Sequence, residues 1–188
     1  MKTIKYILIV SLLSFVSLNA GAQKISVKED DGVHLRIGTE PVDITIQSTS
    51  KAADNYMAPA LYLTVDKKTK KEQYTVTFVL DPHYIFTFDK NSHLYIQTNE
   101  GNTITLTNRE RIEDVLYTYD FFSGSYVQPH YKISAKDLTL IMKEGIKAMR
   151  FESTAGIIDF ISTKNTVALV IKEEYELIRS VIDFDSNF

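Results

Sequence analysis

Residues 131–182 decide the fold, and they read YKISAKDLTLIMKEGIKAMRFESTAGIIDFISTKNTVALVIKEEYELIRSVI. The stretch opens with a full set of helix signals. Ser134 is a good N-cap because its hydroxyl can accept a hydrogen bond from an amide of the first turn, and Asp137 suits the positive end of the helix dipole. Lys143 falls in the last turn, and Gly145 follows as a residue that can close a helix. These signals predict a helix over about residues 134–144.

A β-hairpin is predicted next. Two apolar-rich runs, 146–152 and 157–161, flank a short link that contains Gly156. On the second run Ile158 and Phe160 alternate with a polar residue, so we expect both on the core face. The first run leaves two alternatives open, because Met149 and Phe151 compete with Ile146 and Ala148 for that face.

The stretch ends with a longer amphipathic segment. Polar residues lie opposite an apolar stripe with helical spacing, which predicts a helix over about 165–183. The run 166–171 is rich in β-branched residues and is also compatible with a strand, but the length and later periodicity favour helix. The stripe consists of Val167, Val170, Ile171, Tyr175, Ile178, Val181 and Ile182.

The same stretch resembles a pattern found in an uncharacterised family of exported β-rich bacterial proteins with a C-terminal helix-hairpin-helix segment. The resemblance covers about residues 131–182 and no other part of the chain. It implies a fold and an exported location, and no activity is attached to it. The similar positions are Tyr131–Ser134, Asp137–Leu138, Glu144–Lys147, Arg150–Ser153 and Gly156–Asp159.

Upstream of this stretch, apolar and polar residues alternate in short runs separated by turn signals. This pattern is typical of antiparallel strands joined in a meander. Pro59 is expected to close an irregular segment after a polar loop at 48–55, residues 108–115 to form a short helical turn, and residues 117–124 to form an aromatic loop. The predicted strands are 25–31, 33–37, 42–46, 61–65, 74–80, 84–88, 94–97, 104–106 and 126–133.

The predicted fold class is therefore α+β, a mainly antiparallel β-meander sheet with two helices (about 134–144 and 165–183) packed on one face. An exposed apolar stripe of that length would be unfavourable in water, so both helices should cover the sheet. The expected core includes Leu63, Val76, Phe78, Phe86, Ile96, Leu106, Leu138, Ile158, Phe160, Ile171 and Ile178.

The N-terminus has the pattern of a signal peptide. Lys2 and Lys5 precede an apolar run from Tyr6 to Val16, and Ala20-Gly21-Ala22 forms a small-x-small cleavage signal before Gln23. We expect a signal peptide over 1–22 and a single domain over 23–188, located in the periplasm, at the cell surface or secreted from a Gram-negative bacterium. The alternative is a retained anchor, but the run is short for a bilayer span, and no transmembrane segment is expected after cleavage.

Composition excludes several function classes. Residues 23–188 contain 19 basic and 24 acidic residues, a formal net charge of −5, which argues against a nucleic-acid partner. The chain has no cysteine, so disulfides, thiol catalysis, thiolate metal sites and lipoprotein anchoring are excluded.

No residue pattern predicts a catalytic, metal or cofactor site. His34, His83, His93 and His130 lack the spacing that builds a metal site on one element. Ser123-Gly124 lacks the flanking of a serine elbow, and the seven glycines form no phosphate loop. We therefore expect no catalytic residue, no metal and no cofactor.

Charged clusters leave two further interpretations open. Lys67, Lys68, Lys70 and Lys71 at a predicted hairpin tip suit either an anionic ligand or, as turns usually do, solvent. Paired carboxylates would support a hydrolase; the acids considered are Glu113, Asp114, Asp120 and Asp81.

Aromatic residues give the best indication of function. Exposed rings on a loop would recognise protein or glycan, whereas buried rings would cover the end of the β core. Tyr62 and Tyr95, on outer strand faces, form a second candidate surface. The sequence thus predicts an exported, non-catalytic binding module of the bacterial envelope, with a hydrolase as the alternative and the oligomeric state open. The predicted binding residues are Tyr117, Tyr119, Phe121, Phe122 and Tyr126.

Overall fold

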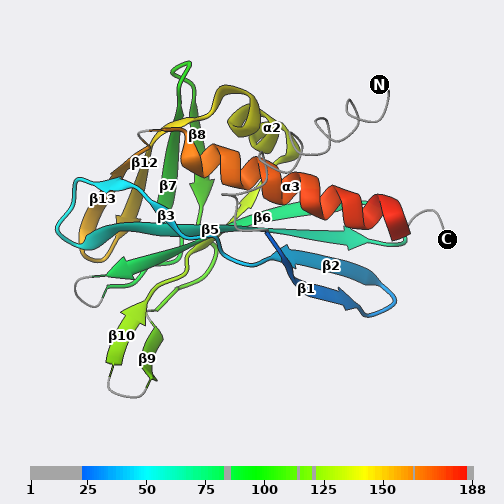
Figure 1. The fold of residues 1–188 in the computed structure, drawn as a ribbon, viewed down its shortest axis with the longest axis horizontal. Helices are drawn as coiled ribbons and strands as arrows, with labels where there is room; N and C mark the ends of the chain where they lie inside the picture. Colours follow the sequence, from blue (N-terminus) through cyan, green and yellow to red (C-terminus); the bar gives the residue numbers. More distant parts are fainter. Residues whose placement is uncertain (1–22, 83–85, 114, 120–121, 163, 186–188) are drawn as a thin grey trace, which may run out of the picture.

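The computed structural model describes residues 23–82, 86–113, 115–119, 122–162 and 164–185, so the predicted signal peptide lies outside it (Figure 1). The N-terminal strands are β1 (Ile25–Asp30), β2 (His34–Thr39), β3 (Ile44–Thr45), β4 (Gln47–Ser48), β5 (Ala53–Asp66) and β6 (Glu72–Pro82). Then come β7 (His93–Thr98), β8 (Thr103–Thr107), β9 (Val115–Tyr119), β10 (Phe122–Tyr126) and β11 (His130–Ile133). The C-terminal elements are α2 (Ala135–Glu144), β12 (Ile146–Ser153), β13 (Gly156–Ile161) and α3 (Thr166–Asp185).

The strands form two larger sheets and one separate hairpin. Sheet A has the order β1-β2-β5-β6-β11, with β3 also paired to β5. Sheet B has the order β4-β13-β12-β7-β8, and β9 pairs only with β10. Every pairing is antiparallel, so the predicted α+β class is confirmed. The meander extends over two sheets because β7 pairs with β12 from the C-terminal unit.

One short segment connects the two sheets. Ile44 of β3 lies opposite Met57 of β5 in sheet A, whereas Ser48 of β4 lies opposite Phe160 of β13 in sheet B. The neighbouring strands β3 and β4 therefore pair with different sheets, and the segment 44–48 links sheet A to sheet B.

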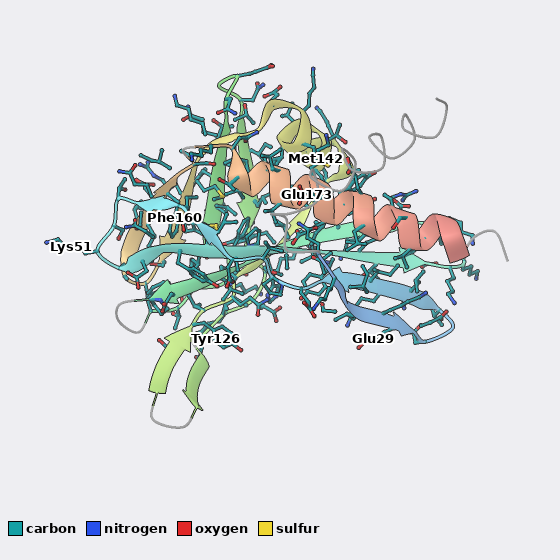
Figure 2. The ribbon with its side chains drawn as sticks, in the orientation of Figure 1. Glu29, Lys51, Tyr126, Met142, Phe160 and Glu173 are labelled. Carbon is teal, nitrogen blue, oxygen red and sulfur yellow. The ribbon has the colours of Figure 1, made fainter. Side chains whose placement is uncertain are left out.

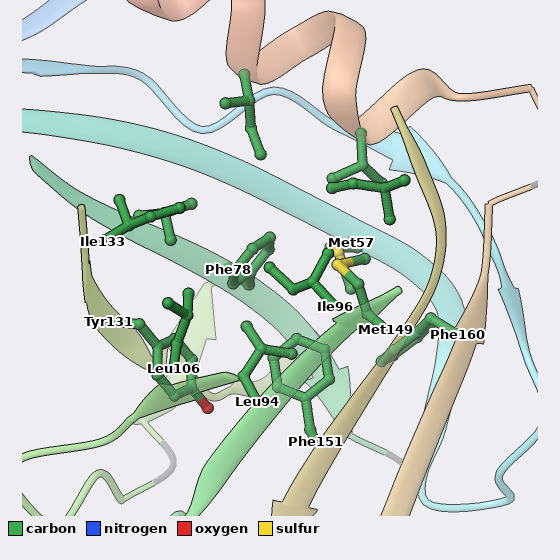
Figure 3. Packing of buried hydrophobic residues seen from close by; sticks show 14 of the residues in the cluster. Met57, Phe78, Leu94, Ile96, Leu106, Tyr131, Ile133, Met149, Phe151 and Phe160 are labelled. Carbon is green, nitrogen blue, oxygen red and sulfur yellow. The ribbon is translucent and has the colours of Figure 1, made fainter. Parts of the chain in front are cut away.

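The core lies between the sheets and is rich in aromatic rings (Figure 3). The Phe151 ring packs edge-on against Phe78 of sheet A at 5.6 Å between centroids and against Phe160 at 5.8 Å. Such edge-to-face pairs add to the hydrophobic contribution of the buried rings. All eleven residues predicted for the core are buried.

The first helix forms as its sequence signals predict. The Ser134 hydroxyl accepts a hydrogen bond from the Asp137 amide at 3.0 Å, and the Gly145 amide donates to the Ile141 carbonyl at 2.8 Å. Gly145 has φ +78°, and a Cβ there would lie 2.3 Å from Asn165 Oδ1. Glycine is thus required by both its backbone conformation and the close approach of the Asn165 side chain.

Helix α3 confirms the helical interpretation of 166–171 and lies across sheet A against β5 and β2 (Figure 1). Tyr175 and Arg179 hold the C-terminal half of α3. The centroid of the Tyr175 ring lies 5.8 Å from that of the Tyr74 ring, and Arg179 Nη1 donates a hydrogen bond to Glu72 Oε1 at 2.6 Å.

No helix in the described part of the chain has the length and hydropathy required to cross a membrane.

A carboxyl group is buried under α3. Glu174 follows Val170 by four residues and Ile171 by three, so it lies on the apolar stripe, and its side chain is completely buried. Among the described residues neither carboxyl oxygen has a hydrogen-bond partner. Burial raises the pKa of Glu174 to about 9, which the neighbouring Thr39 hydroxyl offsets only in part. Glu174 is therefore protonated at neutral pH.

The prediction that Pro59 closes an irregular segment is wrong, because β5 runs through it from Ala53 to Asp66. Pro59 is tolerated because it lies where the neighbour of β5 changes from β3 to β2. At this position the Pro59 carbonyl accepts a hydrogen bond from the Val42 amide at 3.1 Å. No hydrogen bond between paired strands requires the N–H group that proline lacks.

The short helical turn predicted at 108–115 is also wrong. The Ile112 amide and carbonyl both bond to Phe88 at 2.9 Å, and the Asn108 side chain donates to the Asp89 carbonyl at 3.1 Å. These long-range bonds override a weak local helix signal. The strand predicted at 84–88 is also not formed within the described residues. Among residues 86–88, Phe88 makes an isolated β-bridge with Ile112, and residues 83–85 lie outside the described residues.

The predicted aromatic loop at 117–124 is instead a β-hairpin, β9–β10, which extends away from the body (Figure 1). The strand expected at 126–133 is divided: Tyr126 ends β10, Val127 forms a bridge with Leu80, and β11 begins at His130. Pro129, which in the sequence suggests an edge strand or a bulge, lies at this break, and β11 is an edge strand of sheet A.

Candidate functional site

The predicted aromatic binding residues fall on the hairpin β9–β10. Register places Tyr119 opposite Phe122, and Val115 opposite Tyr126. Because residues two apart share a face of a strand, Tyr117, Tyr119, Phe122 and Tyr126 all occupy one face of the hairpin. Only the backbone of Tyr117, Tyr119 and Phe122 is described, and Phe121 lies outside the described residues. Tyr126 is half-buried where the hairpin joins the body (Figure 2).

The two tyrosines predicted on outer strand faces have different surroundings. Tyr62 packs over Gly38, where a Cβ would lie 2.3 Å from the ring. Burial, more than any other cause, raises the pKa of Tyr62, so this ring belongs to the packed body. Tyr95 instead lies on the open face of sheet B, and that face carries the candidate site.

A groove of about 680 Å³ runs over this open face. Its floor consists of the outward-facing residues of β7, β12 and β13, which alternate with core residues such as Ile96, Phe151 and Ile158. The lining residues are Thr49, Tyr95, Gln97, Thr103, Ala148, Met149, Arg150, Glu152, Ile157, Asp159, Phe160 and Ile161.

Strand register aligns the polar residues of the groove in a row. Tyr95 lies opposite Thr105 on one side and Arg150 on the other, and Arg150 lies opposite Asp159. Neighbouring strands are separated by about 4.8 Å, so the row from Tyr95 to Asp159 spans about 10 Å. It crosses β7, β12 and β13 and forms a continuous polar strip.

Glu152 organises one end of the groove. Its carboxylate accepts from the Tyr95 hydroxyl at 3.0 Å and from the His93 amide at 2.9 Å, and it contacts His93 Nδ1 at 2.8 Å. The His93 side chain, more than any other group, lowers the pKa of Glu152, and Glu152 in turn raises the pKa of Tyr95. Glu152 therefore remains ionised and holds the Tyr95 ring, which lies 5.7 Å from the His93 ring.

Arg150 and Asp159 form a two-bond ion pair in the middle of the strip. Arg150 Nε donates to Asp159 Oδ1 at 2.7 Å, and Nη2 donates to Oδ2 at 2.9 Å. This geometry fixes both side chains, and the Asp159 carboxylate raises the pKa of Arg150. The described contacts use two of the five N–H donors of the guanidinium.

Two exposed isoleucines flank Asp159 on β13. Ile157 is 51% exposed and Ile161 is 40% exposed, and both side chains line the groove. The groove thus combines a held aromatic ring, paired charges and an apolar rim.

The remaining predicted groups do not form a site. His83 lies outside the described residues, and His34, His93 and His130 contact three separate carboxylates. Across the described ranges no cluster of His, Asp and Glu could hold a metal ion. Lys67 at the hairpin tip pairs with Asp30.

Two of the four predicted carboxylates, Glu113 and Asp81, belong to the described residues. Glu113 pairs with Arg111 at 3.3 Å, whereas Asp114 and Asp120 lie outside the described residues. Asp81 lies near the end of β6. The two acids that line the groove, Glu152 and Asp159, were not among those considered from the sequence.

The sequence identified Tyr95 but not its neighbours in the groove. Arg150, Glu152 and Asp159 each alternate with core residues, which signals an outward position. Their proximity to Tyr95 depends on the pairing of β7 with β12, which no local pattern specifies.

Comparisons with protein-family models, curated proteins and solved structures give no match to this chain.

Proposed function

We propose that the chain is an exported, non-catalytic binding module of the bacterial envelope, which recognises its ligand in the groove on the open face of sheet B. The groove itself carries this proposal, since pockets with a few fixed polar groups on a largely apolar lining are typical ligand sites. The N-terminal targeting pattern supports the exported location.

The state of the carboxylates favours binding over hydrolysis. Carboxylate hydrolases need one acid with a raised pKa to protonate the leaving group. In the groove, hydrogen bonds from His93 lower the pKa of Glu152, and each carboxylate oxygen of Asp159 accepts one hydrogen bond from Arg150. Neither carboxyl group is therefore arranged as a general acid.

The hairpin β9–β10 supports recognition by a second surface. Tyr117, Tyr119, Phe122 and Tyr126 share one face by register. Rings of this kind contribute large contact areas to protein and glycan recognition.

Incubation of the purified protein with envelope glycans and peptides, scoring both binding and cleavage, tests the proposal. We expect binding without cleavage, and loss of binding in Tyr95→Ala with the fold retained by circular dichroism. The combined variant Tyr117→Ser/Tyr119→Ser is the matched test of the hairpin. Ligand cleavage, or binding that neither variant changes, would contradict the proposal.

Location is tested by fractionating cells that express the full chain. We expect the protein outside the cytoplasm, with an N-terminus at Gln23 by mass spectrometry. A cytosolic protein that retains residues 1–22 would refute the exported location without affecting the binding test.

A further inference from the structure

We infer that the groove on sheet B takes an uncharged oligosaccharide, an inference that rests on the proposed binding function of this face. Three properties of the groove lead to it: its charged side chains are already hydrogen-bonded to neighbouring residues, it offers donors and acceptors side by side, and the hydroxyl of its aromatic ring is held by Glu152.

The charged residues of the groove already have partners. Arg150 is paired with Asp159 through two hydrogen bonds, and Glu152 accepts from Tyr95 and His93. A charged ligand would have to compete with these fixed pairs or leave one partner unmatched, which is unfavourable. A ligand without formal charge can bind while every pair remains intact.

The polar strip matches hydroxyl groups, which both donate and accept hydrogen bonds. Arg150 presents N–H donors beside the carboxylate oxygens of Asp159, and the Gln97 amide adds a donor and an acceptor in the same groove. Neighbouring hydroxyls of a sugar ring can therefore donate to a carboxylate and accept from the guanidinium at once. A peptide backbone usually binds to a free strand edge, whereas here the polar groups lie on the face of the sheet.

Tyr95 provides the apolar contact that a sugar ring needs. Glu152 holds its hydroxyl at 3.0 Å and His93 supports its ring, so little side-chain entropy remains to be lost on binding. The C–H face of a pyranose can lie on such a ring while its hydroxyls reach the strip. Ile157 and Ile161 add apolar surface at the other side of the groove.

Titration calorimetry of the purified protein with single probes tests this inference. The neutral probes are cellohexaose, mannohexaose, maltohexaose and chitohexaose, and the comparison probes are oligogalacturonate and a set of unstructured peptides. We expect at least one neutral oligosaccharide to bind, with an affinity that changes less than twofold between 50 and 500 mM salt because no charges are exchanged.

Three variants separate the contributions. Tyr95→Ala should weaken binding at least tenfold, whereas Tyr95→Phe, which keeps the ring, should stay within about threefold of the parent. Arg150→Ala should weaken binding at least tenfold by removing the donor of the strip. Thermal unfolding of each variant checks that the fold is retained.

The outcomes are distinguishable. Binding of only peptides or only oligogalacturonate, lost in Tyr95→Ala, would overturn the oligosaccharide inference and leave the binding face in place. Absence of binding to every probe, or binding that Tyr95→Ala leaves unchanged, would overturn both the inference and the proposed site.

Discussion

Replacing Glu174 by glutamine removes the ionisable group of a completely buried side chain while keeping its shape. The wild-type carboxyl has a pKa of about 9 in the folded protein against 4.5 as its reference value, because burial disfavours the charged form. A raised pKa means that the folded state holds the proton more tightly than the unfolded state. Stability from this group is therefore fully present below pH 4.5 and is lost as pH rises towards 9.

The size of the effect follows from linkage. One proton of difference between the two states changes the free energy of unfolding by about 1.4 kcal/mol per pH unit. Between pH 5.5 and 7.5, Glu174 should lower the stability of the wild type by about 3 kcal/mol. This is a large part of the roughly 5–15 kcal/mol that stabilises a typical domain.

Urea unfolding from pH 5 to 8 measures the effect. Glu174→Gln should be more stable than the wild type at pH 7.5, and the difference should shrink steadily as pH falls towards 5. Glu176→Gln is the matched control, because Glu176 is exposed on the same helix. Its Oε1 lies 3.9 Å from Lys172 Nζ. Parallel pH profiles for Glu174→Gln and the wild type would refute the buried, protonated carboxyl.

Three further predictions concern the core and the α2 caps, each measured by urea or thermal unfolding. Phe151→Ala should destabilise the protein by about 3–5 kcal/mol, because the ring packs against both sheets; a change below about 1 kcal/mol would contradict the two-sheet core. Gly145→Ala should cost more than about 1 kcal/mol, since φ is +78° and the new Cβ would meet Asn165; an unchanged midpoint would exclude that close approach. Ser134→Ala should cost about 1 kcal/mol by removing the N-cap, and Ser134→Asp should restore most of it.

Local signals were sufficient for the two helices of the C-terminal unit. The capping residues Ser134 and Gly145 mark the ends of α2, and the spacing of the apolar residues resolves α3 as a helix. The open question about β12 is settled by a β-bulge between Ile146 and Ala148, which turns Met149 and Phe151 to the core together with Ile146. A bulge of this kind has no signature in a single sequence.

Features that depend on distant pairing were not predictable. Tyr95 and Glu152 are 57 positions apart and meet only because β7 adds to the C-terminal hairpin. The continuation of β5 through Pro59 depends on a change of neighbouring strand, which the proline itself argues against. The burial of Glu174 could have been predicted from the sequence, since Glu174 lies at helical spacing on the stripe that contains Val170 and Ile171.

The pairing of β4 with β13 joins Ser48 to Phe160 and so determines when folding can finish. Hairpins such as β5–β6 and β12–β13 can form as soon as their own residues are available, but sheet B must await the last third of the polypeptide. Topologies of this high contact order fold slowly. A chain cut short before Ile146 would lack β12 and leave one edge of β7 unpaired, and such a fragment should self-associate through that edge.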